Sequence, residues 1–226
     1  MVFVLFDTLC CFDAHTAEKK YENPDVIPTG LKNPYPNCLL VTHDGKYLLF
    51  SVGYEPHIYV AEAATGRVLC VLRGHGKGSI IALCVHPYEN LLYSSSEDET
   101  LRRWNIETGE CEQVYDVPFG KQQAVGWLTN ICVSPKDHRL YASATANGIA
   151  VWDERSGAVL PHLLVERESP CGSLAVSPDG RTLYARGCVI RPSDGYFSEN
   201  GALAEARCLW LSPDGKKSLL RIYVAS

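Results

Sequence analysis

Histidine and cysteine are the residue types in this chain that could support metal binding or acid–base chemistry. The 226-residue chain has 10 cysteines and 7 histidines, and both side chains are common zinc ligands. A zinc site needs ligands at short spacing, yet no Cys-x-x-Cys pair occurs and no histidine has a partner at ligand spacing. We therefore predict no metal site and no catalytic residue, and we expect reduced thiols. Small, buried side chains are expected for the cysteines of the inner (first) strands, Cys38, Cys84, Cys132, Cys171 and Cys208, and for Cys10 and Cys11.

A glycine-rich segment at residues 74–79, GHGKGS, is similar to a phosphate-binding loop in composition. It lacks the G-x-x-x-x-G-K-[ST] spacing, and no helix is predicted after it. The chain also lacks a G-x-S-x-G nucleophile motif and a constellation of paired carboxylates. The sequence therefore predicts no cofactor and no enzymatic activity.

The elements that carry these side chains are short strands. Within residues 72–111, runs of strand length that are rich in β-branched and aromatic residues occupy 80–85, 91–95 and 100–106. Turn residues bound each run, and no room is left for a ten-residue helix. The segment is predicted to form four short strands.

This pattern is an internal repeat. The end of the first strand of each copy has a shared apolar position, which falls at Val41, Val85, Val133, Val176 and Leu211. The spacing is close to the period of about 40 to 45 residues of propeller repeats, with one long and one short member. Turns such as Ser-Pro-Asp-Gly follow, in which proline fixes φ and glycine accepts φ > 0.

The unit at residues 72–111 resembles the WD40 family of β-propellers. Gly74-His75 and Trp104-Asn105 stand where the family repeat has its Gly-His and Trp-Asp pairs. The resemblance implies an all-β propeller of four-stranded antiparallel blades. It also implies a buried hydrogen-bond chain with a structural role, formed by His75, Ser94, Asp98 and Trp104.

A second blade departs from this pattern. Trp152-Asp153 keeps the tryptophan, but Ala142 and Ala146 replace the serine and the aspartate of the central unit. The same polar chain cannot form in that blade.

One domain, residues 1–226, is expected. Its parts are a partial blade at 1–22, a proline-rich linker at 23–37, blades at 38–72, 73–116, 126–165 and 170–200, and terminal strands at 205–226. The first blade lacks a first strand, and residues 207–211 read as a first strand that could complete it. Two alternatives remain: a five-bladed ring with this composite blade, or an incomplete larger propeller.

Charge and hydropathy exclude several partners. The chain has 26 acidic and 21 basic residues, a net charge of −5, and no basic run longer than two residues. Nucleic acid and anionic membranes are therefore not expected partners. No signal peptide or membrane helix is predicted, so we expect a cytoplasmic or nuclear protein.

The resemblance implies a non-enzymatic scaffold for protein–protein interactions, a subunit or adaptor of a multiprotein complex. Loop 116–126 has no packing reason to be enlarged, which marks it as a candidate binding surface. The candidate protein-binding residues are Phe119, Lys121, Trp127, Tyr54, Glu97 and Arg103. The alternatives are an enzyme of another propeller family, lactonase-like or quinoprotein-like, and an inactive fragment.

Overall fold

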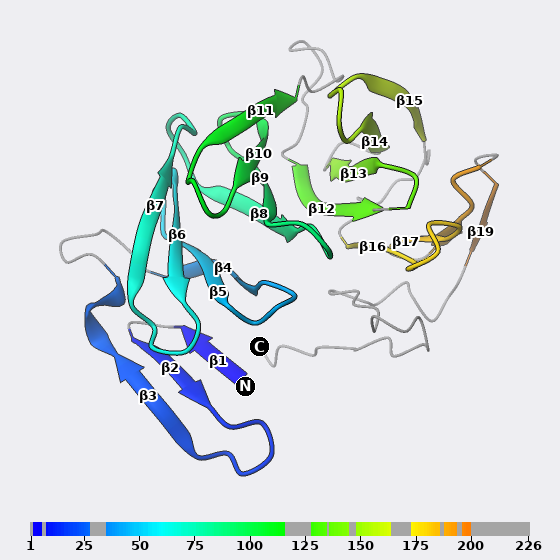
Figure 1. Cartoon of the computed structure of the whole chain (residues 1–226). Helices are drawn as coiled ribbons and strands as arrows, with labels where there is room; N and C mark the ends of the chain where they lie inside the picture. Colours follow the sequence, from blue (N-terminus) through cyan, green and yellow to red (C-terminus); the bar gives the residue numbers. More distant parts are fainter. Residues whose placement is uncertain are drawn as a thin grey trace. The chain divides into compact units, whose positions relative to one another are not determined.

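The computed structural model describes most of the chain, and its secondary structure is almost entirely β-strand. The described residues are 2–5, 8–27, 35–115, 128–134, 136–144, 148–163, 173–185, 188–193 and 196–199. They form one 3-10 turn and 19 strands in five antiparallel sheets, one of three strands and four of four strands (Figure 1). The predicted all-β class with four-stranded antiparallel blades is confirmed. No helix in this described part is long and apolar enough to span a membrane.

The chain divides into two compact units, Met1–Val114 and Tyr115–Ser226. The first unit begins with the three-stranded sheet. Its strands are β1 (Val2–Leu5), β2 (Leu9–Phe12) and β3 (Lys19–Asn23), in the order β1-β2-β3. The 3-10 turn η1 (Pro24–Val26) follows, and the side chain of Asn23 accepts a hydrogen bond from the Asp25 backbone N–H.

Two four-stranded sheets come next. The first contains β4 (Pro36–Val41), β5 (Tyr47–Val52), β6 (His57–Glu62) and β7 (Val68–Arg73). The second contains β8 (Ile80–Val85), β9 (Leu91–Ser96), β10 (Leu101–Asn105) and β11 (Cys111–Tyr115). In each sheet the strands pair in sequence order, as a meander does.

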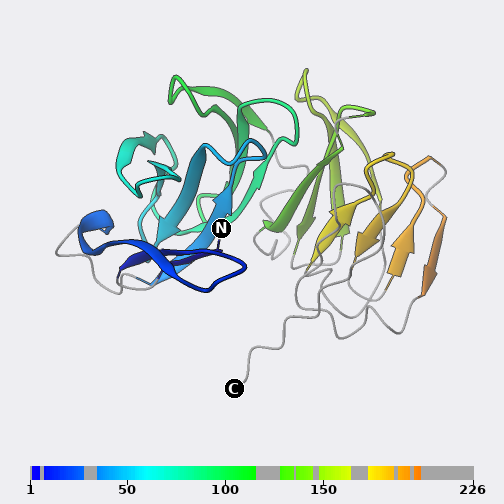
Figure 2. The same cartoon turned by 60° about the horizontal axis from the view of Figure 1, so that its bottom comes forward.

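The second unit has two more sheets of the same topology. One is formed by β12 (Leu128–Ser134), β13 (Arg139–Ala144), β14 (Gly148–Asp153) and β15 (Val159–Leu163). The other is formed by the shorter strands β16 (Leu174–Val176), β17 (Leu183–Ala185), β18 (Cys188–Ile190) and β19 (Phe197–Glu199). Figure 2 shows the strands of each sheet side by side.

The hydrophobic cores lie between neighbouring sheets. A second strand such as β5 is buried on both faces and so contributes to two cores. All six residues of β5 are buried, and alternate side chains enter different cores. Leu48 and Phe50 pack with Leu9 of the first sheet, whereas Leu49 packs with Trp104 of the next sheet. This arrangement explains why such strands are continuously apolar instead of alternating.

The second unit has an equivalent core, with Tyr141 and Val151 on one side and Leu183 on the other. One of the predicted Ser-Pro-Asp-Gly turns lies at residues 177–180. The Gly180 N–H bonds to the Ser177 carbonyl oxygen at 2.9 Å, and Gly180 has φ of 70°. A Cβ atom there would lie 2.8 Å from Oγ of Ser134, so both backbone angle and space require glycine.

The strand boundaries differ slightly from the expected blade boundaries. β4 begins at Pro36, inside the segment expected to be a linker, and η1 occupies residues 24–26 of that segment. The expected terminal strands at 205–226, and with them the composite blade, lie outside the described residues.

Candidate functional site

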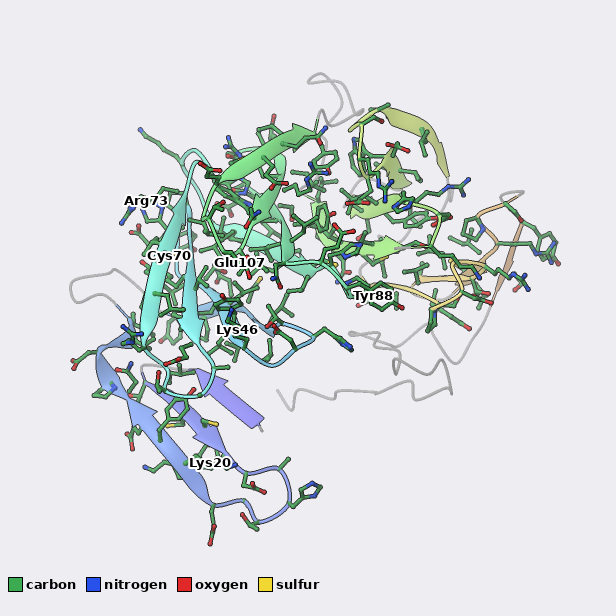
Figure 3. All side chains as sticks on the ribbon, in the orientation of Figure 1. Lys20, Lys46, Cys70, Arg73, Tyr88 and Glu107 are labelled. Carbon is green, nitrogen blue, oxygen red and sulfur yellow. The ribbon has the colours of Figure 1, made fainter. Side chains whose placement is uncertain are left out.

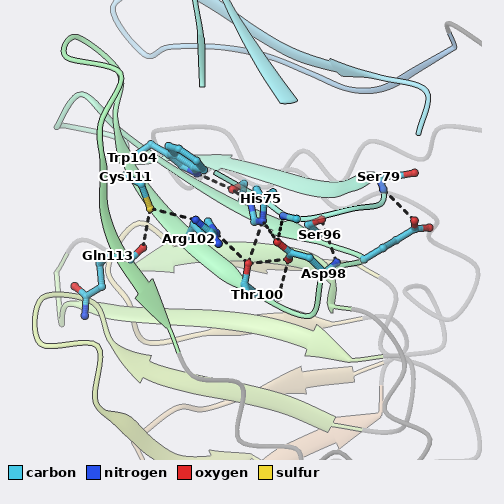
Figure 4. A network of polar contacts seen from close by, with 12 residues as sticks. His75, Ser79, Ser96, Asp98, Thr100, Arg102, Trp104, Cys111 and Gln113 are labelled. Atoms are coloured by element: carbon cyan, nitrogen blue, oxygen red, sulfur yellow. Dashed lines mark hydrogen bonds and ion pairs between the residues drawn. The ribbon is translucent and has the colours of Figure 1, made fainter. Parts of the chain in front are cut away.

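The sheet β8–β11 holds the four residues of the expected hydrogen-bond chain, and the structure brings all four together. His75 lies in the loop before β8, Ser94 in β9, Asp98 in the β9–β10 turn and Trp104 in β10. Trp104 Nε1 donates to Ser94 Oγ at 2.8 Å, and Ser94 Oγ lies 2.7 Å from His75 Nε2. His75 Nδ1 lies 2.9 Å from Asp98 Oδ2. We call these four residues the His75 network (Figure 4).

The direction of the protons in the His75 network follows from the donors available. The indole of Trp104 can only donate, so Ser94 Oγ is an acceptor in that bond and its single hydroxyl proton is left for His75 Nε2. His75 Nδ1 then carries the proton that is donated to the Asp98 carboxylate. Each donor between the Trp104 indole and the Asp98 carboxylate therefore has a hydrogen-bond acceptor.

Two residues that the sequence analysis did not single out extend the network. Thr100 Oγ1 donates to Asp98 Oδ1 at 2.7 Å and lies 3.0 Å from His75 Nδ1. Arg102 Nε donates to Thr100 Oγ1 at 3.1 Å. Thr100 lies just before β10 and Arg102 lies within it. Because both are spaced from Trp104 by steps of two residues, they share its face of the strand, and this periodicity was the sequence signal that could have identified them.

The Asp98 carboxylate is stabilised in its charged form. Burial raises the pKa of Asp98, but hydrogen bonds from His75, the Gly76 backbone N–H and Thr100 outweigh burial and hold the pKa well below its usual range. The Gly76 bond is 2.7 Å long. Asp98 therefore fixes the loop before β8 to the β9–β10 turn.

The His75 network is largely buried. The His75 side chain is 0% exposed, and both ring nitrogens are in hydrogen bonds within the protein. Ser94 is fully buried and Trp104 is 1% exposed. The polar groups of the network are therefore bonded chiefly to one another.

The glycine-rich loop before β8 holds carboxylates of its own. The Gly76 N–H donates to Asp98 Oδ2, and the Ser79 N–H donates to Glu97 Oε2 at 2.9 Å. Gly78 has φ of 112°, and a Cβ atom on it would lie 2.7 Å from Cβ of Glu97. These backbone amides are therefore occupied by side chains of the same sheet.

The expected protein-binding residues lie in different environments. Tyr54, in the β5–β6 connection, is 69% exposed. Glu97 is half-buried and bonded to the Ser79 N–H. Arg103 Nε lies 3.2 Å from Glu112 Oε2, with 16% of the arginine side chain exposed. Phe119, Lys121 and Trp127 lie outside the described residues.

In the second unit, the sheet with Trp152 uses different contacts. Trp152 is 0% exposed, and Tyr115 meets it edge-on, with ring centroids 6.3 Å apart. The Tyr115 hydroxyl donates to the Glu154 carbonyl oxygen at 2.7 Å. Ala142 is buried at the place that the sequence alignment equates with Ser94.

The cysteines in the described ranges are free thiols in varied environments. Burial raises the pKa of Cys38 to about 11, so this thiol stays protonated. Cys132 is buried, with 8% exposure, whereas Cys38 and Cys84 are only partly buried and Cys111 is exposed. The inner-strand cysteines 171 and 208 lie outside the described residues. No group of three or more histidine, cysteine, aspartate or glutamate side chains in the described part could hold a metal ion.

Residues 66–105 match the family model described as WD domain, G-beta repeat. The matched stretch runs from the turn before β7 to the last residue of β10, and it contains the whole His75 network. The chain thus carries a WD40 repeat, and the resemblance stated from Gly74-His75 and Trp104-Asn105 is confirmed.

Three relatives are similar to parts of the chain. Eukaryotic translation initiation factor 3 subunit I of Aspergillus fumigatus is 39% identical over 106 residues, which are 47% of this chain and 28% of the relative. WD repeat-containing protein 26 homolog of Arabidopsis thaliana is 26% identical over 149 residues, 65% and 24% of the two chains. Target of rapamycin complex subunit wat1 of Schizosaccharomyces pombe is 22% identical over 149 residues, 66% and 45% of the two chains. The matched segments thus cover less than half of each relative.

Proposed function

We propose that this chain, which carries a WD40 repeat within four-stranded antiparallel sheets, is a non-enzymatic scaffold. It would bind other proteins as a subunit or adaptor of a larger complex. The observation that carries this proposal is the burial of the His75 network. Its imidazole, hydroxyl and carboxylate are the groups most similar to a catalytic constellation, and they are bonded to one another inside the sheet. Function then depends on the exposed turns that the rigid sheets present.

The names of two relatives support a role in complexes. One is a subunit of a translation initiation factor and the other is a subunit of the target of rapamycin complex. The chain has 26 acidic and 21 basic residues, and this acidic balance favours protein partners over nucleic acid or anionic membranes. We place the protein in the cytoplasm or the nucleus on the same grounds.

The residues that we propose to bind partners include Tyr54 and, separately, Phe119, Lys121 and Trp127. Tyr54 is exposed and aromatic, and such side chains are common anchors of protein interfaces. Glu97 and Arg103, the other two candidates, each already have a hydrogen bond or ion pair with a residue of the β8–β11 region. Their substitution is expected to act on the fold as well as on binding.

Affinity capture tests this proposal. The tagged full chain is captured from extracts of its own cells, and proteins retained with it are quantified by mass spectrometry beside the Tyr54→Ala and Lys121→Ala variants. We expect a reproducible set of proteins in amounts comparable to the bait, with reduced retention by the variants. Recovery of the folded bait with no protein above the untagged control would overturn the proposal.

A further inference from the structure

A groove lies between two turns of the first unit, at the ends of the adjacent strands β4 and β8. It has a volume of about 390 Å³ and is lined by residues 42–44 of the β4–β5 turn and residues 85–90 around the β8–β9 turn. We call it the Tyr88 groove. Figure 3 labels Tyr88 at the turn after β8, with Lys46 and Glu107 on neighbouring turns. The sequence of these segments predicts only turns.

Both walls of the Tyr88 groove are held in place by side chains. His86 is 3% exposed, and its Nδ1 accepts hydrogen bonds from the backbone N–H groups of Tyr88 at 3.3 Å and Glu89 at 2.9 Å. On the opposite wall, Asp44 Oδ1 accepts from Thr42 Oγ1 at 2.6 Å and from the Lys46 N–H at 3.0 Å. A groove with preformed walls loses little conformational entropy when a ligand binds.

An exposed aromatic ring stands at the edge of the groove. The Tyr88 side chain is 75% exposed, and its ring meets His86 edge-on, with centroids 6.2 Å apart. One side of the ring is therefore supported, while most of its surface faces solvent. An open tyrosine face can bind a cation or a planar guanidinium.

The groove is lined by acidic side chains. The lining includes the carboxylates of Asp44 and Glu89 and neither lysine nor arginine. Lys46, two residues after Asp44, has its Nζ 4.6 Å from the Tyr47 ring centroid and 4.0 Å from Glu107 Oε1. Glu107 also accepts a hydrogen bond from Asn90, a lining residue, at 2.9 Å. The potential of the groove is therefore negative and complementary to a basic ligand.

We infer that the Tyr88 groove binds an extended segment of a partner protein that carries arginine or lysine side chains. The guanidinium or ammonium group lies against the Tyr88 ring, and its N–H groups bind the carboxylates of Asp44 and Glu89. The volume accommodates long side chains of an extended peptide, whereas a folded domain would contact only the rim. This inference rests on the proposed scaffold function and specifies one of its surfaces.

Fluorescence anisotropy of a labelled arginine–glycine repeat peptide, titrated with the full chain, tests the inference. The variants are Tyr88→Ala and Glu89→Lys, since both side chains are exposed. Tyr35→Ala is the control for loss of an exposed tyrosine, and Glu18→Lys makes the same charge change on the β2–β3 turn. We expect each groove variant to weaken binding about tenfold, with both controls near wild type and a glutamate–glycine peptide unbound.

Two results would overturn the inference. One is an arginine–glycine peptide that binds no more tightly than the glutamate–glycine peptide. The other is an equal loss of affinity in Glu18→Lys and Glu89→Lys, which would assign binding to net charge alone. Thermal unfolding of each variant, expected to match wild type, shows that lost affinity is not lost fold. Capture of partners by the tagged chain is measured separately, so the scaffold function can stand when the groove assignment fails.

Discussion

The indole N–H of Trp104 donates to the hydroxyl of Ser94 at 2.8 Å, and Ser94 is completely buried. The same hydroxyl lies 2.7 Å from His75 Nε2, so a single oxygen joins two aromatic side chains from different parts of the repeat. Removing it leaves two buried polar groups without this partner. The stability of the sheet β8–β11 is expected to depend on that oxygen.

We predict that Ser94→Ala destabilises the protein by about 2 to 4 kcal/mol, because each buried polar group that loses its partner costs roughly 1 to 3 kcal/mol. The measurement is urea unfolding followed by tryptophan fluorescence. A double-mutant cycle with Trp104→Phe isolates the bond, since phenylalanine has no N–H. Additive effects of the two substitutions would show that the bond contributes nothing.

The Asp98 carboxylate predicts a pH dependence. Hydrogen bonds hold its folded-state pKa below that of the unfolded chain, so its contribution to stability is present above the unfolded pKa of about 3.9. That contribution is lost as the pH falls through this value toward the lower folded pKa. Urea midpoints measured from neutral pH down to about pH 3 should fall more steeply for wild type than for Asp98→Asn. Parallel curves would exclude Asp98 as a source of acid sensitivity.

In the second unit, Tyr115→Phe is expected to destabilise the protein by about 1 kcal/mol, the usual net contribution of one hydrogen bond. The Tyr115 hydroxyl donates to the Glu154 carbonyl at 2.7 Å, and the side chain is 1% exposed. Phenylalanine keeps the ring against Trp152 and removes only the hydroxyl. Tyr54→Phe, at an exposed position, is the control and should leave the unfolding midpoint unchanged. Equal midpoints for wild type and Tyr115→Phe would contradict the prediction.

We also propose that residues 207–211 pair with β1 on the side away from β2. β1 pairs with β2 along one edge, and the sheet has three strands where the others have four. The sequence of 207–211 matches the first strands of the other sheets. Truncation after residue 204 is expected to speed amide hydrogen exchange in β1, while β9, inside its own sheet, stays protected. Unchanged exchange in β1 would refute the composite blade.

Much of the fold could be predicted because short sequence motifs and apolar runs identify the repeat. The sheet β8–β11 could be located from Gly74-His75, the apolar runs and Trp104. The register of its strands then places Ser94 and Asp98 near the His75 imidazole. The Tyr88 groove could not be predicted in this way. It depends on how β4 packs against β8, and nothing in the residues 42–44 identifies residues 85–90 as their neighbours.

Tyr115 illustrates the same limit. Its partner Glu154 lies 39 residues away, and the bond uses a backbone carbonyl, which every residue has. The sequence showed only that Ala142 replaces the serine of the central repeat, so that a different arrangement must support Trp152.

The scaffold function is tested most directly by the native size of the chain in its own cells. The tagged protein, expressed at its natural level, is separated by size-exclusion chromatography at moderate salt and followed by immunoblot. Our account predicts elution in an assembly far larger than one chain, together with the proteins recovered by capture. Elution of the folded protein at the size of a single chain, with no co-eluting partner, would contradict it.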